Sequence, residues 1–187
     1  MDQSIHTTLN QCAALQKQVG FAHRLVVPFS VEYHFEAPDT REPTFTDTLD
    51  ITAQGQLSYE PVRAMRVNLP KAGGAIGREV LIPDSLSATV PGKASVQGPG
   101  AGGDFGVSAI AIMISGPLPG ISASVTFQCP EIAVANIQFD VDPNTPPPIR
   151  LVSNDVRGKT TVVLHLGAAA IVFGLPAGPH EVGPVLG

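Results

Sequence analysis

The stretch GVSAIAIMISGPLPGISASVTFQ, residues 106–128, decides the fold class, because it joins two apolar arms through a Pro-Gly turn. In the second arm, apolar side chains alternate with Ser, Thr and Gln, which is typical of a half-buried strand. The first arm is apolar on both faces, with Ile110, Ile112 and Ile114 on one and Ala109, Ala111 and Met113 on the other. We therefore expect a β-hairpin whose first arm is covered on both faces.

Three interpretations of this hairpin are open. It is the core of an ordinary β domain, or a hairpin buried in part by a neighbouring subunit, or the membrane-piercing hairpin of a pore former. Arms of roughly 9 to 11 residues suit a transmembrane hairpin. The pore is the least favoured interpretation, because isoleucines occupy the face that would be wet and no aromatic girdle flanks the arms. The core hairpin is preferred.

The rest of the chain predicts an all-β fold: an antiparallel β-sandwich or jelly roll with one N-terminal α-helix and an irregular C-terminal tail. Short alternating segments follow one another, separated by turns rich in proline and glycine. We expect a helical extension over residues 1–20, a β-sandwich domain over 21–175 and the tail over 176–187. The glycine-rich segment 89–106 is interpreted as a mobile loop between strands.

One helix is expected, over residues 4–19, and Gly20 supplies its stop signal. Its apolar stripe follows steps of four and three and has only five positions: Ile5, Leu9, Cys12, Gln16 and Val19. A stripe this narrow suits a groove, either on the same chain or on a neighbouring subunit. A terminal helix that clasps the next copy is therefore one hypothesis for its role.

Charge is scarce in this chain, at 14% of 187 residues, with a formal net charge of −5. Soluble domains carry about 25% charged residues, so much of the surface is expected to be covered by other copies or by a partner. The net negative charge and the absence of a basic run predict no nucleic-acid-binding face. The first residues do not form a signal peptide and no apolar run reaches the ~20 residues of a membrane span, so synthesis in the cytoplasm is expected.

The most suggestive polar set is Glu32, His34 and Glu36, which lie two residues apart on one face of a predicted strand. Such a set could share a cation or transfer a proton, but a solvated strand face is the preferred interpretation. The spacing of Asp140, Asp142 and Asn144 matches only the start of a calcium loop. We therefore expect no metal site, no cofactor and no catalytic residue.

Two cysteines, Cys12 and Cys129, are too few for a disulfide framework or a structural zinc site. They are expected to be free, buried thiols. His165 is expected to be a half-buried histidine of a strand.

These features are typical of a non-enzymatic structural subunit that self-assembles into a large particle, such as a virus or phage capsid, a tail or an appendage. Its partners would be copies of itself and other subunits of the same assembly. The alternative is a β-sandwich ligand-binding module; an enzyme or a pore former is less favoured. The residues expected at the subunit interface come from the helix and the first arm of the hairpin: Ile5, Leu9, Cys12, Val19, Ile110, Ile112 and Ile114.

Overall fold

The computed structural model describes residues 1–20, 23–61, 63–71, 74–82, 84–116, 122–132 and 134–172. One α-helix, one short 3-10 helix and eleven strands lie in these ranges. They are α1 (Ile5–Val19), β1 (Arg24–Pro38), β2 (Thr46–Glu60), β3 (Arg63–Lys71), β4 (Gly74–Ile82), β5 (Ser85–Gly98), β6 (Ala101–Ser115), β7 (Ala123–Cys129), η1 (Pro130–Ile132), β8 (Val134–Val141), β9 (Ile149–Asp155), β10 (Gly158–Leu166) and β11 (Ala170–Val172).

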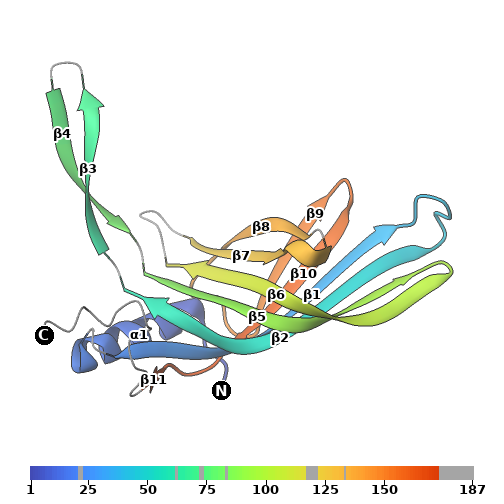
Figure 1. The fold of residues 1–187 in the computed structure, drawn as a ribbon, viewed down its shortest axis with the longest axis horizontal. Helices are drawn as coiled ribbons and strands as arrows, with labels where there is room; N and C mark the ends of the chain where they lie inside the picture. Colours follow the sequence, from blue (N-terminus) through green and yellow to red (C-terminus); the bar gives the residue numbers. More distant parts are fainter. Residues whose placement is uncertain are drawn as a thin grey trace, which may run out of the picture.

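Nine of the strands form one antiparallel sheet in the order β8-β7-β6-β5-β2-β1-β10-β9, and β11 pairs with the start of β1. The sheet curls until its two edge strands, β8 and β9, approach each other (Figure 1). The predicted antiparallel β fold with one N-terminal helix is confirmed, but the sheet is a nearly closed barrel rather than clearly a sandwich. Long strands cause this, since twist accumulates along 15-residue strands such as β1, β2 and β6. The predicted tail, residues 176–187, lies outside the described residues.

The core fills the inside of this barrel. Along β1, alternate residues from Leu25 to Tyr33 point inward and are buried. The ring of Tyr33 stacks on that of Phe127 in β7, with centroids 5.0 Å apart. Because β1 and β7 are four places apart in the strand order, this contact crosses the interior and holds opposite walls together.

Helix α1 packs against one end of its own barrel. Ser4 caps the helix by accepting a hydrogen bond from Thr7 N at 3.2 Å, and Gly20 ends it with a φ of 69°. The N-terminal segment is tied to β10 through a hydrogen bond from Gln3 N to Leu166 O, 2.9 Å long. A second tie runs from Ala169 N to the side chain of Gln11, also 2.9 Å. No helix among the described residues is long and apolar enough to cross a membrane.

The helix residues expected at a subunit interface lie in this contact. Ile5, Leu9 and Cys12 belong to the buried core, and Val19 packs against its margin. Their apolar character is thus accounted for within one chain, with no second copy needed to cover them. An interface role for them stays a prediction.

Within the stretch 106–128, β6 and β7 pair antiparallel, while residues 117–121 of the predicted Pro-Gly turn lie outside the described residues. Among the described residues only one face of β6 is covered. Ile110, Ile112 and Ile114 are buried in the barrel, whereas Met113 on the other face is 46% exposed. Within the described part of one chain the second face of β6 is therefore not covered, and cover by another copy stays a prediction. As with the helix, the three isoleucines need no neighbouring subunit to bury them, so their predicted interface role is also still untested.

A β-bulge in β6 sets this arrangement. The register passes from Val90–Ile110 to Gly92–Val107, so two residues on β6, Ser108 and Ala109, oppose one on β5, Pro91. The extra residue places Val107 on the same face as Ile110, and both side chains are buried. Gly92 leaves the room this needs, because a Cβ there would lie 2.3 Å from Ile110 Cδ1 and 2.5 Å from the carbonyl oxygen of Thr52.

The glycine-rich segment 89–106 is not a loop, contrary to expectation. It forms the end of β5 and the start of β6, paired from Lys93–Gly106 to Gly98–Ala101. Pro99 and Gly100 make the turn, and Gly100 has a φ of 79°, which suits a glycine after proline. Each glycine of this segment has a backbone N–H and a C=O, as other residues do, so the glycines can pair across the two strands and only a short turn is needed to join them.

Strands β3 and β4 form a separate two-stranded sheet, which we call the arm. Nine cross-strand pairs run from Arg63–Ile82 to Lys71–Gly74. The arm stands away from the barrel (Figure 1). It is an insertion between β2 and β5, whose adjoining ends are already paired through Glu60 and Ser85.

Candidate functional site

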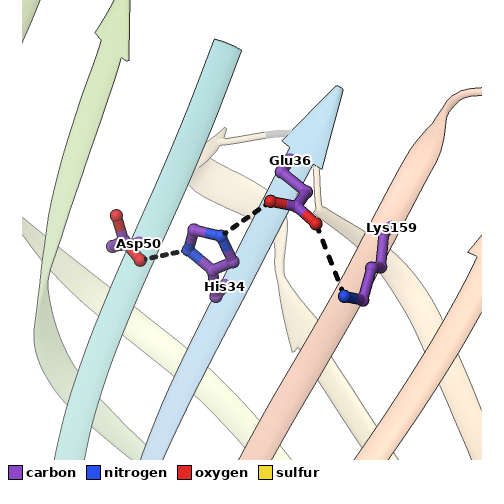
Figure 2. A network of polar contacts seen from close by, with 4 residues as sticks. All are labelled: His34, Glu36, Asp50 and Lys159. Carbon is purple, nitrogen blue, oxygen red and sulfur yellow. Dashed lines mark hydrogen bonds and ion pairs between the residues drawn. The ribbon is translucent and has the colours of Figure 1, made fainter. Parts of the chain in front are cut away.

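The polar groups expected on β1 form a network on the outer wall of the barrel, across β2, β1 and β10 (Figure 2). His34 Nδ1 lies 2.6 Å from Asp50 Oδ1, and His34 Nε2 lies 3.7 Å from Glu36 Oε2. The other oxygen of Glu36 lies 3.5 Å from Lys159 Nζ. Strand pairing positions these groups, because His34 is opposite Asp50 and Glu36 is opposite Lys159.

This network can do little chemistry as it stands. All four side chains are about half exposed, and exposed ion pairs contribute roughly 0–1 kcal/mol. His34 is held between two carboxylates rather than against a hydroxyl or thiol that it could activate. Among the described residues, no group of three or more His, Cys, Asp or Glu side chains is suited to a metal ion.

Glu32 belongs to the predicted set but not to the network. It lines a surface cavity of about 330 Å³ that the four network residues also line, together with Arg150 and Thr161. The sequence pattern brought Glu32, His34 and Glu36 to one strand face, as expected. It missed Asp50 and Lys159, which only the pairing of β1 with β2 and β10 brings there.

The second predicted set, Asp140, Asp142 and Asn144, ends β8. Asp142 Oδ1 accepts hydrogen bonds from the backbone and the side-chain amide of Asn144, at 2.9 and 3.3 Å. Asp142 therefore stabilises a turn. Asp140 faces a cavity of about 370 Å³ between the edge strands β8 and β9.

A carboxylate that sequence analysis missed, Glu131 in η1, stabilises the bulge of β6. Its Oε1 accepts hydrogen bonds from Ser108 N at 2.8 Å and Ala109 N at 2.9 Å, and from the Ser108 hydroxyl. The bulge removes the backbone N–H groups of Ser108 and Ala109 from the ladder, and Glu131 accepts the hydrogen bonds that they can no longer make there. The hydrogen bonds from Ser108, and then that from Ala109, hold the pKa of Glu131 below its ordinary value of 4.5.

Glu131→Gln is expected to reduce stability at pH 7 and to have no effect at low pH. A folded pKa below the unfolded one gives stability that is present above pH 4.5 and is lost as the pH falls through the folded pKa. Urea unfolding midpoints between pH 7 and pH 2.5 should therefore converge for the two proteins. Glu32→Gln, which removes an exposed carboxylate on β1, three places from β6 in the strand order, is the matched control. A difference from wild type that is constant with pH would contradict the role of the charge.

A buried polar cluster lies where α1 meets the barrel. The hydroxyl of Tyr59 donates to the carboxylate of Asp84, and burial raises the pKa of Asp84 despite this bond. Burial, and then the nearby Asp84 carboxylate, raise the pKa of Cys12 to about 12. Burial likewise raises the pKa of Tyr59 to about 12.

The two cysteines are free and buried, as predicted. Burial raises the pKa of Cys129 as well as that of Cys12. Both thiols are therefore protonated at neutral pH, and neither has the thiolate character of a nucleophile. They act as small apolar side chains of the core.

His165 is partly exposed on β10, close to expectation. Its Nδ1 lies 2.6 Å from Asp2 Oδ2, which adds a polar tie between the N-terminal segment and the barrel.

The arm is the part of the molecule whose sequence differs most from the rest. Its strands carry four of the eleven cationic residues of the chain, at Arg63, Arg66, Lys71 and Arg78, against one acid, Glu79. The arm is thus +3 within a chain of −5, and the remainder carries −8. The sequence pattern did not show that these two strands pair only with each other among the described strands. The local excess of cations was the available signal.

Comparison of the chain with protein-family models, with curated protein sequences and with solved structures finds no match.

Proposed function

We propose that this chain is a non-enzymatic structural subunit, made in the cytoplasm, that assembles with copies of itself and with other subunits into a larger particle. A virus or phage capsid, a tail and an appendage are the assemblies of this kind that suit a charge-poor β domain.

The observation that carries the proposal is the arm. A two-stranded hairpin in water is at best marginally stable without a third strand or a packing surface. The arm has nine cross-strand pairs, yet in the described part of the chain neither of its strands pairs with the barrel. A hairpin of this length, with no third strand beside it among the described residues, needs a partner to cover its edges.

Two further features support assembly over the alternatives. Charge is sparse, and several large apolar side chains are exposed, among them Phe45 and Phe105.

A ligand-binding module is less well supported. The cavity of about 650 Å³ over β5, β6 and β7 is lined largely by small and amide side chains such as Ser87, Thr89 and Gln128. Pockets for small molecules are mostly apolar.

Replacing residues 61–83 by a single glycine should abolish assembly and leave the barrel folded. Glu60 and Ser85 are already cross-strand partners, so Gly followed by Asp84 gives a two-residue hairpin turn. This design keeps Asp84 and its hydrogen bond with Tyr59. Light scattering after size exclusion should show a multimer for the full chain and a monomer for the variant.

Thermal unfolding is the control for this variant, since its midpoint should stay close to that of the full chain. A full chain that is monomeric at every concentration and salt level tested would overturn the proposal. So would a variant that assembles as well as the full chain does, because the arm would then have no part in assembly.

A further inference from the structure

The surface that could receive the arm lies at the opposite end of the barrel, which we call the distal end. It consists of residues 35–50 and 93–106, where the β1–β2 and β5–β6 hairpins project (Figure 1). Strand β2 runs from Thr46, in the distal end, to Glu60, where the arm leaves it. A strand of 15 residues spans about 45 Å. The arm also points away, so it cannot reach the distal end of its own chain.

One face of the sheet points into the core within the barrel. At the distal end, the same face carries apolar side chains that are in part exposed. Phe35, Leu49 and Val96 are neighbours across three strands, and Phe105 is paired with the buried Ala94. Along β5 burial decreases outward from Ala94, which is buried, to Val96, which is 39% exposed, while Phe105, beside Ala94 on β6, is 41% exposed. Phe35 and Leu49 are partly buried at the margin of the core. Phe45, in the β1–β2 connection, is 52% exposed. The apolar face of the sheet thus extends beyond the barrel that covers it.

The charge of the distal end is opposite to that of the arm. Residues 35–50 and 93–106 hold six carboxylates and two cationic side chains, a net charge of −4, against +3 on the arm. The acids at the tip are held in place, since Asp39 accepts hydrogen bonds from the backbone of Arg41 and Glu42 at 2.6 and 2.7 Å. An acidic rim around exposed apolar side chains complements a basic hairpin that lacks a third strand.

We propose that the arm of one copy docks on the distal end of the next copy. This inference rests on the proposed function and names the surfaces through which the copies meet. Because the two surfaces differ and lie at opposite ends, the contact is head-to-tail. It produces a ring if the rotation between copies closes, and a filament if it does not.

Charge reversal on each surface tests the contact. Glu42→Lys/Asp104→Lys alters the distal end at two exposed positions, and Arg66→Glu/Arg78→Glu alters the arm. The first double variant changes the net charge of the distal end from −4 to 0, and the second changes that of the arm from +3 to −1, so either one removes the attraction and self-association should weaken about 100-fold. In an equimolar mixture the unchanged arm of the first variant meets the unchanged distal end of the second, so one contact of the wild-type kind forms again. Sedimentation velocity should therefore show a heterodimer in the mixture and monomers for either variant alone.

Glu32→Lys/Asp140→Lys is the matched control, since it makes the same charge change at exposed positions of the barrel wall. It should assemble like the wild-type chain. If the distal-end variant assembles as tightly as wild type, or if the mixture gives no heterodimer, the docking inference is overturned while assembly itself stands. If the wild-type chain does not assemble at all, the proposed function fails as well.

Discussion

Ile114→Asp is expected to leave little folded protein at pH 7. Ile114 is fully buried between Leu86 of β5 and Val125 of β7. Burying the aspartate in its neutral form at pH 7 costs about 4 kcal/mol, since each pKa unit is worth 1.36 kcal/mol. The lost isoleucine burial adds about 1.5–3 kcal/mol, and an unsatisfied carboxyl about 1–3 kcal/mol. The sum approaches the 5–15 kcal/mol by which whole domains are stable.

Met113→Asp is the matched control, one residue away on the other face of β6. Its side chain is 46% exposed, so the aspartate stays in water and the cost should be under about 1 kcal/mol. Urea unfolding followed by circular dichroism separates the two variants. The deficit of Ile114→Asp should shrink by several kcal/mol at pH 4, where protonation costs little. A folded, soluble Ile114→Asp protein at pH 7 that has only lost assembly would mean that the cover comes from a neighbouring subunit.

The two faces of β6 show how far the sequence predicts the fold. Alternation identified the strands and put Ile110, Ile112 and Ile114 on one face, because side-chain direction in a strand is a local property. The bulge at Ser108 and Ala109 was not predictable in this way. It depends on the carboxylate of Glu131, more than 20 residues away, which accepts the hydrogen bonds that the ladder cannot.

The closure of the sheet was beyond sequence patterning for a similar reason. Alternating segments fit a sandwich and a barrel equally well, since both have one apolar face. What distinguishes them here is the unbroken ladder from β8 to β9 and the contact between Tyr33 and Phe127 across the interior. Both depend on the accumulated twist of long strands, whose lengths the pattern underestimated: the predicted loop at 89–106 is itself strand.

In the candidate site, too, the sequence shows which residues share a face of one strand but not which residues strand pairing adds. His34 and Glu36 share a face because they are two residues apart on one strand, and the sequence shows this directly. Asp50 and Lys159 join them only through the register of β1 with its two neighbours. The isolation of the arm depends on the pairing of Glu60 with Ser85, which leaves β3 and β4 outside the barrel. That pairing is a long-range contact, and the sequence of the two strands does not reveal it.

Removal of residues 1–19 should prevent the barrel from folding, because α1 contributes to the same core as the strands. Ile5, Leu9 and Cys12 are buried there, and Leu15 and Val19 pack at its margin. Truncating one buried leucine to alanine costs about 2–5 kcal/mol, so losing the whole face would remove most of the stability of a typical domain. The shortened chain should be recovered unfolded or aggregated, with the apolar end of the barrel uncovered.

Leu9→Ala is the graded form of this test, because it keeps the helix and removes one contact. It should lower the free energy of unfolding by about 3 kcal/mol, measured by urea unfolding on the full chain. Gln18→Ala, at an exposed position of the same helix, is the control and should change stability by only a few tenths of a kcal/mol. If the chain without residues 1–19 is folded and soluble but no longer assembles, α1 works between copies, and its docking on its own barrel is not what holds the subunit together.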